Sequence, residues 1–165
     1  MLAVNTLAID PGSEHSALVK LNDKGFPYWF AKVDNAAARV ETVRSRIHIG
    51  PQGQIDHLAI EMIASYGMPV GKEVFDTCLW IGRIIEAWSG PFTLVYRREV
   101  KMFLCGNNAA KDGNIRQALI DRYGGKVAAI GNKRSPGPLY GISADVWSAL
   151  AVAVTWQGTH GKQIA

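Results

Sequence analysis

The chain has 165 residues, of which 48% are hydrophobic and 19% are charged, and this balance excludes a disordered or fibrous protein. Lysine and arginine number 18 against 14 aspartate and glutamate residues, so the formal net charge is +4. A mildly basic balance favours an anionic partner, most commonly nucleic acid, although basic proteins without such a partner also occur. The length suits a single domain over residues 1–165, with a frayed tail at 158–165.

The cysteines and the hydropathy pattern indicate in which cellular compartment the protein is found. Cys78 and Cys105 each lie in an apolar segment, without a second cysteine at metal-binding spacing, and we interpret both as buried residues in a reducing compartment. No stretch approaches the roughly 20 apolar residues of a membrane span, and no signal-like segment is apparent. We therefore expect a cytoplasmic protein without a membrane partner.

Three strand patterns come first along the chain. Residues 5–10 and 16–21 are apolar runs, and residues 26–33 are rich in aromatic side chains. The turn NDKG ends in Gly25, which is free to adopt a positive φ. Short turns of this kind join antiparallel neighbours, so these segments predict a three-stranded antiparallel unit.

The pattern then changes to helices that alternate with strands. Apolar residues between 40 and 47 follow helical spacing, and GPQGQ at 50–54 ends that helix. Residues 56–61 and 92–96 are strand patterns, and a helix from about 70 to 88 separates them. A strand that is reached through a helix usually lies parallel to its neighbour.

The last third of the chain is mainly helical. Residues 97–123 contain two basic helical segments that each finish in glycine, a common helix stop. Residues 124–142 are rich in glycine and proline and are expected to form a functional or mobile loop. A final apolar helix follows from Ser143. The predicted fold is α/β, with a mixed five-stranded sheet of three antiparallel strands plus parallel strands, flanked by helices.

Three acidic residues occupy positions that need an explanation. Asp10 and Glu61 each end one of the two most hydrophobic strand patterns, where a carboxylate must be solvated, paired or bound to a cation. Ser143 is a suitable N-cap and would place Asp145 in the first turn of the last helix, directed into the fold. The alternative for Asp145 is a favourable interaction with the helix dipole. Three such carboxylates suit Mg²⁺ or Mn²⁺, and two ions about 4 Å apart can hydrolyse a phosphodiester.

Four motifs resemble those of a known family. They are AIDPG at 8–12, AIE at 59–61, REVK at 98–101 and ADVWSALAVA at 144–153. Their order and spacing resemble the RuvC-type Holliday junction resolvases of the ribonuclease H-like, or retroviral-integrase-like, superfamily. The likeness extends over about residues 5–157, and the segment WIGRIIEAW resembles phage-encoded relatives.

The resemblance implies an activity and a set of ligands. It implies that Asp10, Glu61 and Asp145 are catalytic acids that bind Mg²⁺, with Mn²⁺ as a substitute and two ions in each active site. It also implies a homodimer that cleaves opposed strands of a four-way DNA junction in a bacterial or phage-infected cell. The family's final motif carries a further acid where this chain has Ser148, which shares a helix face with Asp145. Because a hydroxyl is a weaker Mg²⁺ ligand than a carboxylate, one metal position is expected to be weakened or filled through water.

The resemblance also implies contacts with DNA. Lys101 falls on the matching position of REVK, Lys111 lies close to another, and Tyr66 lies in the loop where the family places an aromatic that stacks on an unpaired base. Further basic candidates are Arg98, Arg116, Lys133 and Arg134. The alternative for each basic residue is a solvated surface charge, and for Tyr66 a position at the edge of the core.

An apolar stripe on the helix at 70–88 has two interpretations. By the resemblance it forms a dimer interface, and otherwise it packs on the chain's own sheet. The stripe consists of Val74, Cys78, Ile81, Ile85 and Trp88.

Three functions remain open at this point. The first is a metal-dependent, structure-selective DNA endonuclease, with a related RNA-cleaving nuclease as a near rival. The second is a junction-binding module of the same fold whose cleavage is weakened by Ser148. The third is an actin-like ATPase, suggested by IDPG alone and disfavoured because the chain lacks a second glycine-rich phosphate loop.

Overall fold

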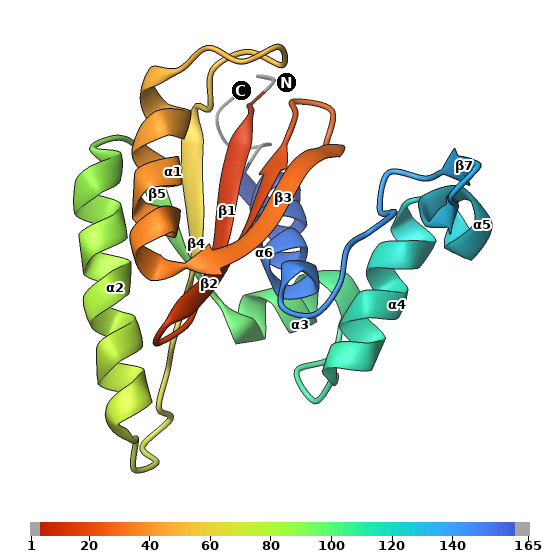
Figure 1. Cartoon of the computed structure of the whole chain (residues 1–165). Helices are drawn as coiled ribbons and strands as arrows, with labels where there is room; N and C mark the ends of the chain where they lie inside the picture. Colours follow the sequence, from red (N-terminus) through yellow and green to blue (C-terminus); the bar gives the residue numbers. More distant parts are fainter. Residues whose placement is uncertain (1–3, 161–165) are drawn as a thin grey trace.

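Five strands form one mixed sheet in the order β3-β2-β1-β4-β5 (Figure 1). The structure is a computed structural model and describes residues 4–160. Strands β1 (Thr6–Pro11), β2 (His15–Leu21) and β3 (Pro27–Asp34) are antiparallel neighbours. β4 (His57–Met62) is parallel to β1, and β5 (Phe92–Tyr96) is parallel to β4. The predicted α/β fold is therefore confirmed.

Helices cover both faces of this sheet (Figure 1). α1 (Asn35–Ile47) and α2 (Lys72–Trp88) pack on one face, where their side chains share a core with Leu7 and Ile9 of β1. α6 (Val146–His160) packs on the other face, where Ala8 belongs to a second core. Alternation along β1 thus divides its buried side chains between two helical layers.

Small residues line the contact between α6 and the central strands. Ala8, Ala17 and Ala59 of the sheet share this core with Ala149 and Ala153 of α6, all of them almost fully buried. Small side chains on both sides let the helix approach the sheet closely. α6 is buried through most of its length, as its apolar sequence predicts.

The basic helical region divides into two helices. α3 (Arg97–Cys105) ends at Gly106, whose φ of +63° is the left-handed conformation that glycine adopts readily. α4 (Asp112–Arg122) follows after a short turn. Gly25 also has a positive φ, of +82°, in the turn between β2 and β3. Both glycine assignments agree with the sequence analysis.

The expectation of a loop over residues 124–142 was wrong in part. This segment forms α5 (Gly125–Ala129) and a small hairpin of β6 (Gly131–Asn132) and β7 (Ser135–Pro136). The Leu139 amide donates to the Ala129 carbonyl at 2.8 Å and closes the segment on itself. A Cβ on Gly137 would lie 2.3 Å from two carbonyl oxygens, so this packing requires glycine there. Because backbone contacts rather than a repeat of apolar side chains hold this segment together, the hydrophobic pattern of the sequence does not predict it.

Three smaller expectations can be compared with the structure. Of the tail expected at 158–165, residues 158–160 belong to α6, and residues 161–165 lie outside the described residues. Cys78 and Cys105 are half-buried rather than buried. Within residues 4–160, no helix combines the length and the apolar character needed to cross a membrane.

Candidate active site

Asp10 and Glu61 meet at one edge of the sheet. Ile9 lies opposite Ile60 in the parallel pair of β1 and β4, and each acid is the next residue along its strand. Ala8 and Ala59 face α6, so the alternation of side chains directs Asp10 and Glu61 to that same face. Two carboxylates from separate parts of the chain are thereby held side by side, both of them half-buried.

The proximity of the two acids changes their protonation. Burial, together with the negative charges of Glu61 and Asp145, raises the pKa of Asp10 to about 7. Burial also raises the pKa of Glu61, although the Arg97 guanidinium opposes this shift. Of the two groups, Asp10 is the one whose pKa the neighbouring Glu61 carboxyl raises. A site that holds its acids this close favours the approach of a cation.

The third acid is close to the pair, but its setting differs from the prediction. Asp145 directly precedes α6, which begins at Val146, and its side chain is 53% exposed rather than directed into the fold. The Asp145 carbonyl accepts from the Ala149 amide, which makes Asp145 the residue that flanks the helix. Ala144 before it has a φ of +46°, and Ser143 lies three residues before Val146, where α6 begins, rather than directly before the helix. The expectation of Asp145 in the first helical turn was therefore wrong by one position.

Two cations contact the acids and were missed by the sequence analysis. Lys32 of β3 forms an ion pair with Asp145. Arg97, the first residue of α3, lies with its Nη1 4.0 Å from Glu61 Oε1 and also pairs with Asp112. Arg97 directly follows β5, whose carboxyl end lies at the same edge of the sheet as that of β4. Because residues after the carboxyl ends of parallel strands gather at one edge, the position of Arg97 could have been predicted from the sequence.

The position of Lys32 follows from the strand register. Asp10 is opposite Ala17 in the β1–β2 pair, and Ala17 is opposite Lys32 in the β2–β3 pair. The three residues therefore form one row across the sheet, with their side chains on one face. Because Ala17 is small, the long lysine side chain can extend across it towards the acids.

A hollow of about 220 Å³ opens beside the two strand acids. Tyr66, in the loop after β4, lines this hollow and is 71% exposed. Its φ is +50°, an uncommon conformation for a bulky residue, and such backbone outliers cluster at functional sites. The hollow is lined by Asp10, Pro11, Glu61, Met62, Ile63, Ala64, Tyr66 and Arg97.

The predicted DNA-binding residues fall into two groups. Arg98 and Lys101 lie on α3 next to Arg97, and Lys111 precedes Asp112, which contacts that arginine. Arg98 and Lys101 thus share a helix with the arginine that lies 4.0 Å from Glu61, and Lys111 adjoins the second carboxylate that this arginine contacts.

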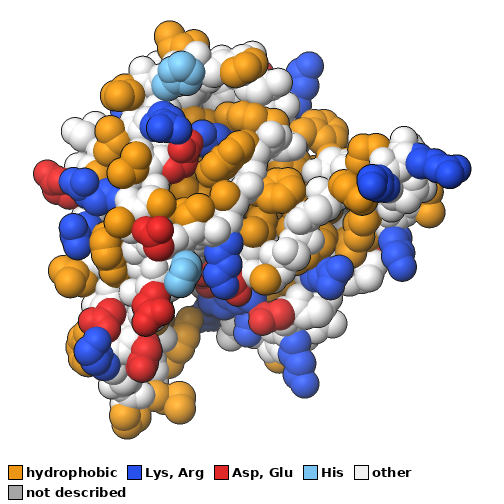
Figure 2. All heavy atoms as spheres, viewed as in Figure 1, with side chains coloured by type: hydrophobic (Ala, Val, Ile, Leu, Met, Phe, Trp, Pro, Cys, Tyr) orange, Lys and Arg blue, Asp and Glu red, His pale blue; other side chains and the backbone are white. Residues whose placement is uncertain are grey.

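The second group lies on the part of the chain from α4 to the hairpin, which extends to the side of the sheet (Figure 1). Lys133 and Arg134 are exposed at the hairpin turn between β6 and β7. Arg116 of α4 stacks over the Trp147 ring at 4.9 Å, so its guanidinium is engaged within the molecule. Figure 2 shows lysine and arginine side chains exposed over this region.

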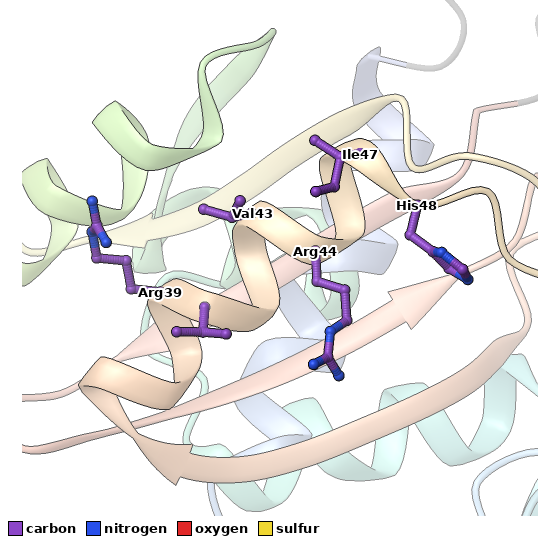
Figure 3. A pocket seen from close by; sticks show the side chains of 6 residues that line it. Arg39, Val43, Arg44, Ile47 and His48 are labelled. Atoms are coloured by element: carbon purple, nitrogen blue, oxygen red, sulfur yellow. The ribbon is translucent and has the colours of Figure 1, made fainter.

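A larger hollow, of about 540 Å³, runs along the outer face of α1 (Figure 3). It contains no carboxylate and mixes exposed aliphatic side chains with basic ones, so it lacks the groups for hydrolytic chemistry. Its lining residues are Arg39, Val40, Val43, Arg44, Ile47 and His48.

The donor set at the sheet edge suits a hard divalent cation, because carboxylate oxygens are the ligands that Mg²⁺ and Mn²⁺ prefer. Asp10, Glu61 and Asp145 are near enough to one another to influence the pKa of Asp10. Within residues 4–160, however, no three acidic, histidine or cysteine side chains form a preassembled metal-binding cluster. The ion pairs of Lys32 and Arg97 hold two of the three acids in their present positions.

Comparisons with known proteins show the fold. The sequence matches no protein-family model and no curated protein. The structure is similar to Thermus thermophilus RuvC, with a TM-score of 0.69 and 15% sequence identity, over 97% of this chain and 96% of that chain. It is also similar to T. thermophilus RuvC in complex with Holliday junction substrate, with a TM-score of 0.67 and 14% identity over the same shares of both chains. The chain therefore has the ribonuclease H-like fold seen in RuvC.

Proposed function

We propose that this protein is a divalent-metal-dependent endodeoxyribonuclease that cleaves branched DNA, with the four-way junction as its foremost substrate. The observation that carries the proposal is the pair of half-buried acids, Asp10 and Glu61, at the ends of adjacent parallel strands. A structurally similar protein that is bound to a Holliday junction supports the choice of substrate class.

In this proposal the acids bind Mg²⁺, or Mn²⁺ in its place, with two ions in each site. Asp10 and Glu61 would hold the cation at the sheet edge, and Asp145 would bind it from the start of α6. Such ions would supply an activated water and stabilise the leaving oxygen. Asp10 must give up its proton to act as a ligand, and the mutual repulsion of the acids favours this exchange for a cation.

The DNA backbone contacts basic residues around the acids in this proposal. Lys101, Arg98 and Lys111 lie nearest in the chain to the Arg97 contact, and Tyr66 is exposed beside the hollow for stacking on an unpaired base. Arg116, Lys133 and Arg134 would contact a more distant part of the DNA.

Cleavage of a synthetic four-way junction in Mg²⁺ tests the proposal. The wild-type protein is compared with Asp10→Asn, which removes one charge, and with Asp23→Asn, the same change in the exposed turn before β3. We expect Asp10→Asn to reduce cleavage by at least a hundredfold and Asp23→Asn to leave it unchanged. Equal cutting by all three proteins would contradict the assignment, and a linear duplex of the same length tests the preference for branches.

A second candidate function is a junction-binding module with weakened cleavage. It is favoured by Ser148, which occupies the helix face next to Asp145 where a further acid would complete the ligand set. Junction affinity that persists in EDTA, without nicking in Mn²⁺, would support it. Cleavage of an RNA-containing junction in place of the DNA junction would instead favour an RNA-cleaving nuclease.

We further propose a homodimer through α2. Phe75 and Leu79, which are not members of the predicted stripe, are 65% and 62% exposed on this helix. The stripe itself packs inward through buried Ile81 and Trp88. Exposed large apolar residues on one helix are typical of an interface. Light scattering should give a dimer mass for the wild type and a monomer mass for Leu79→Glu. The matched control is Val127→Glu, which changes an 89% exposed side chain on α5, and dissociation by both variants would contradict the choice of α2.

A further inference from the structure

Lys32 and Arg97 approach the acid cluster from opposite edges of the sheet, from β3 and from the end of β5. The Lys32 ammonium is paired with Asp145, and the Arg97 guanidinium lies 4.0 Å from Glu61. Both side chains come from elements that flank the central strands, β3 for the lysine and the start of α3 for the arginine. Neither is part of the proposed ligand set, because a cationic side chain cannot donate an electron pair to a metal.

The two cations differ in how firmly the protein holds them. Arg97 has a side chain only 26% exposed and is also paired with Asp112, so its position is determined by two carboxylates. Lys32 is 45% exposed and reaches Asp145 over the small Ala17. Arg97 is therefore the less exposed of the two and is paired with two carboxylates, whereas Lys32 is paired with Asp145.

The charge balance of the cluster depends on these residues. Asp10, Glu61 and Asp145 repel one another when ionised, and a cation beside them offsets that repulsion. The carboxylates of Glu61 and Asp145 that pair with the two cations are also the groups whose oxygens a metal ion would need. An ion pair and a metal bond to one carboxylate therefore compete.

We propose that Lys32 and Arg97 are internal counter-cations: they stabilise the assembled acids before metal binds and are displaced from Asp145 and Glu61 when it binds. This inference rests on the proposed function, since it assumes a metal site at these acids. They are positioning residues, and they set the metal concentration at which the site fills.

The test measures Mn²⁺ binding alone, by titration followed by electron paramagnetic resonance, without DNA. We expect Lys32→Gln and Arg97→Gln each to bind Mn²⁺ about two- to tenfold more tightly than the wild type, because a competing cation has been removed. In EDTA, the same variants should melt at a lower temperature than the wild type, because the acids lose their counter-charge. Lys32→Arg and Arg97→Lys keep the charge and should restore wild-type behaviour in both measurements.

Arg44→Gln is the matched control, because Arg44 lies 3.8 Å from Glu41 in an ion pair on α1 that has no contact with the three acids. It should leave Mn²⁺ binding unchanged. If Lys32 or Arg97 were needed only for folding, its replacement would lower both the melting temperature and the Mn²⁺ affinity. The counter-cation role instead predicts a higher Mn²⁺ affinity.

The possible failures are distinguishable. In the first case, the wild type binds Mn²⁺ and the Asp10→Asn variant does not, so the metal site is present. If both glutamine variants then bind Mn²⁺ no more tightly than the wild type, the counter-cation role alone is overturned. If the wild type and all variants fail to bind Mn²⁺, the proposed metal site is wrong and the counter-cation role is overturned with it.

Discussion

Asp10 and Glu61 are 51 positions apart in the chain, yet each follows one of two isoleucines that are paired across β1 and β4. The parallel register places both carboxyl groups at the same edge and on the same face of the sheet. Burial and the neighbouring negative charges of Glu61 and Asp145 raise the pKa of Asp10 to about 7. The proximity of the two acids therefore makes the stability of the folded protein depend on pH.

The metal-free protein should lose stability as the pH rises from about 4 to about 7. The pKa of Asp10 is raised from 3.8 to about 7, so in this range the folded state keeps a proton that the unfolded state releases. Above pH 7 Asp10 is ionised in both states, and the loss of stability caused by its buried charge is complete. Asp10→Asn removes it, and we expect the melting temperature in EDTA at pH 8 to rise by about 3–6 °C. At pH 4 the two proteins should melt at similar temperatures, and an equal difference at both pH values would refute this explanation.

Ser148→Asp should strengthen a metal position that the natural sequence leaves weak. Ser148 lies in the first turn of α6, where an acid is also favourable to the helix dipole, so the change should not unfold the protein. We expect cleavage of the four-way junction in Mg²⁺ to increase about tenfold or more. Ser143→Asp adds the same charge before the helix and should have no such effect. No increase, with junction binding intact, would show that the serine does not limit the reaction.

Ala144→Gly should relieve strain next to Asp145. Ala144 has a φ of +46°, a left-handed conformation that costs a residue with a Cβ about 1 kcal/mol. Glycine removes this cost but adds freedom to the unfolded chain, so we expect a gain of up to about 1 kcal/mol in the free energy of unfolding. Denaturant titration measures it. The same change at Ala36, exposed in α1, should be destabilising, and a loss of stability at both sites would contradict the assigned strain.

Protonation of His57 should destabilise the folded protein as the pH falls below about 6.5. Its ring is stacked on Trp156, with centroids 4.0 Å apart, and its Nε2 is 2.9 Å from the Thr93 hydroxyl. Burial, with a smaller effect of the nearby His160, lowers the pKa of His57 from 6.5 to about 4. The folded state therefore resists protonation, and the stability present above pH 6.5 is lost as the pH falls towards 4.

The comparison that isolates this effect uses His57→Gln, measured against the wild type from pH 4 to 7. The variant should be less stable at pH 7, because the stacking is lost, and its stability should change less between pH 7 and pH 4. His48→Gln is the control, because His48 is exposed after α1. Parallel pH profiles for the wild type and His57→Gln would contradict the role of His57.

Much of the architecture could be predicted from local patterns. The strands, their antiparallel and parallel pairing and the apolar α6 follow from side-chain periodicity and connection length, which depend on neighbouring residues alone. The hairpin after α5 could not be predicted in this way, because it is closed by backbone contacts around Gly137 rather than by an apolar repeat.

The amino-acid sequence by itself determined which acids end the central strands, because β1 and β4 carry their carboxylates in equivalent places along two similar apolar runs. Tertiary structure alone decided what surrounds those acids. Lys32 meets Asp145 across 113 positions of the chain, and Arg97 reaches Glu61 and Asp112 at the junction of three elements. Ion pairs of this kind depend on strand register and helix packing, and no periodicity within either segment encodes them.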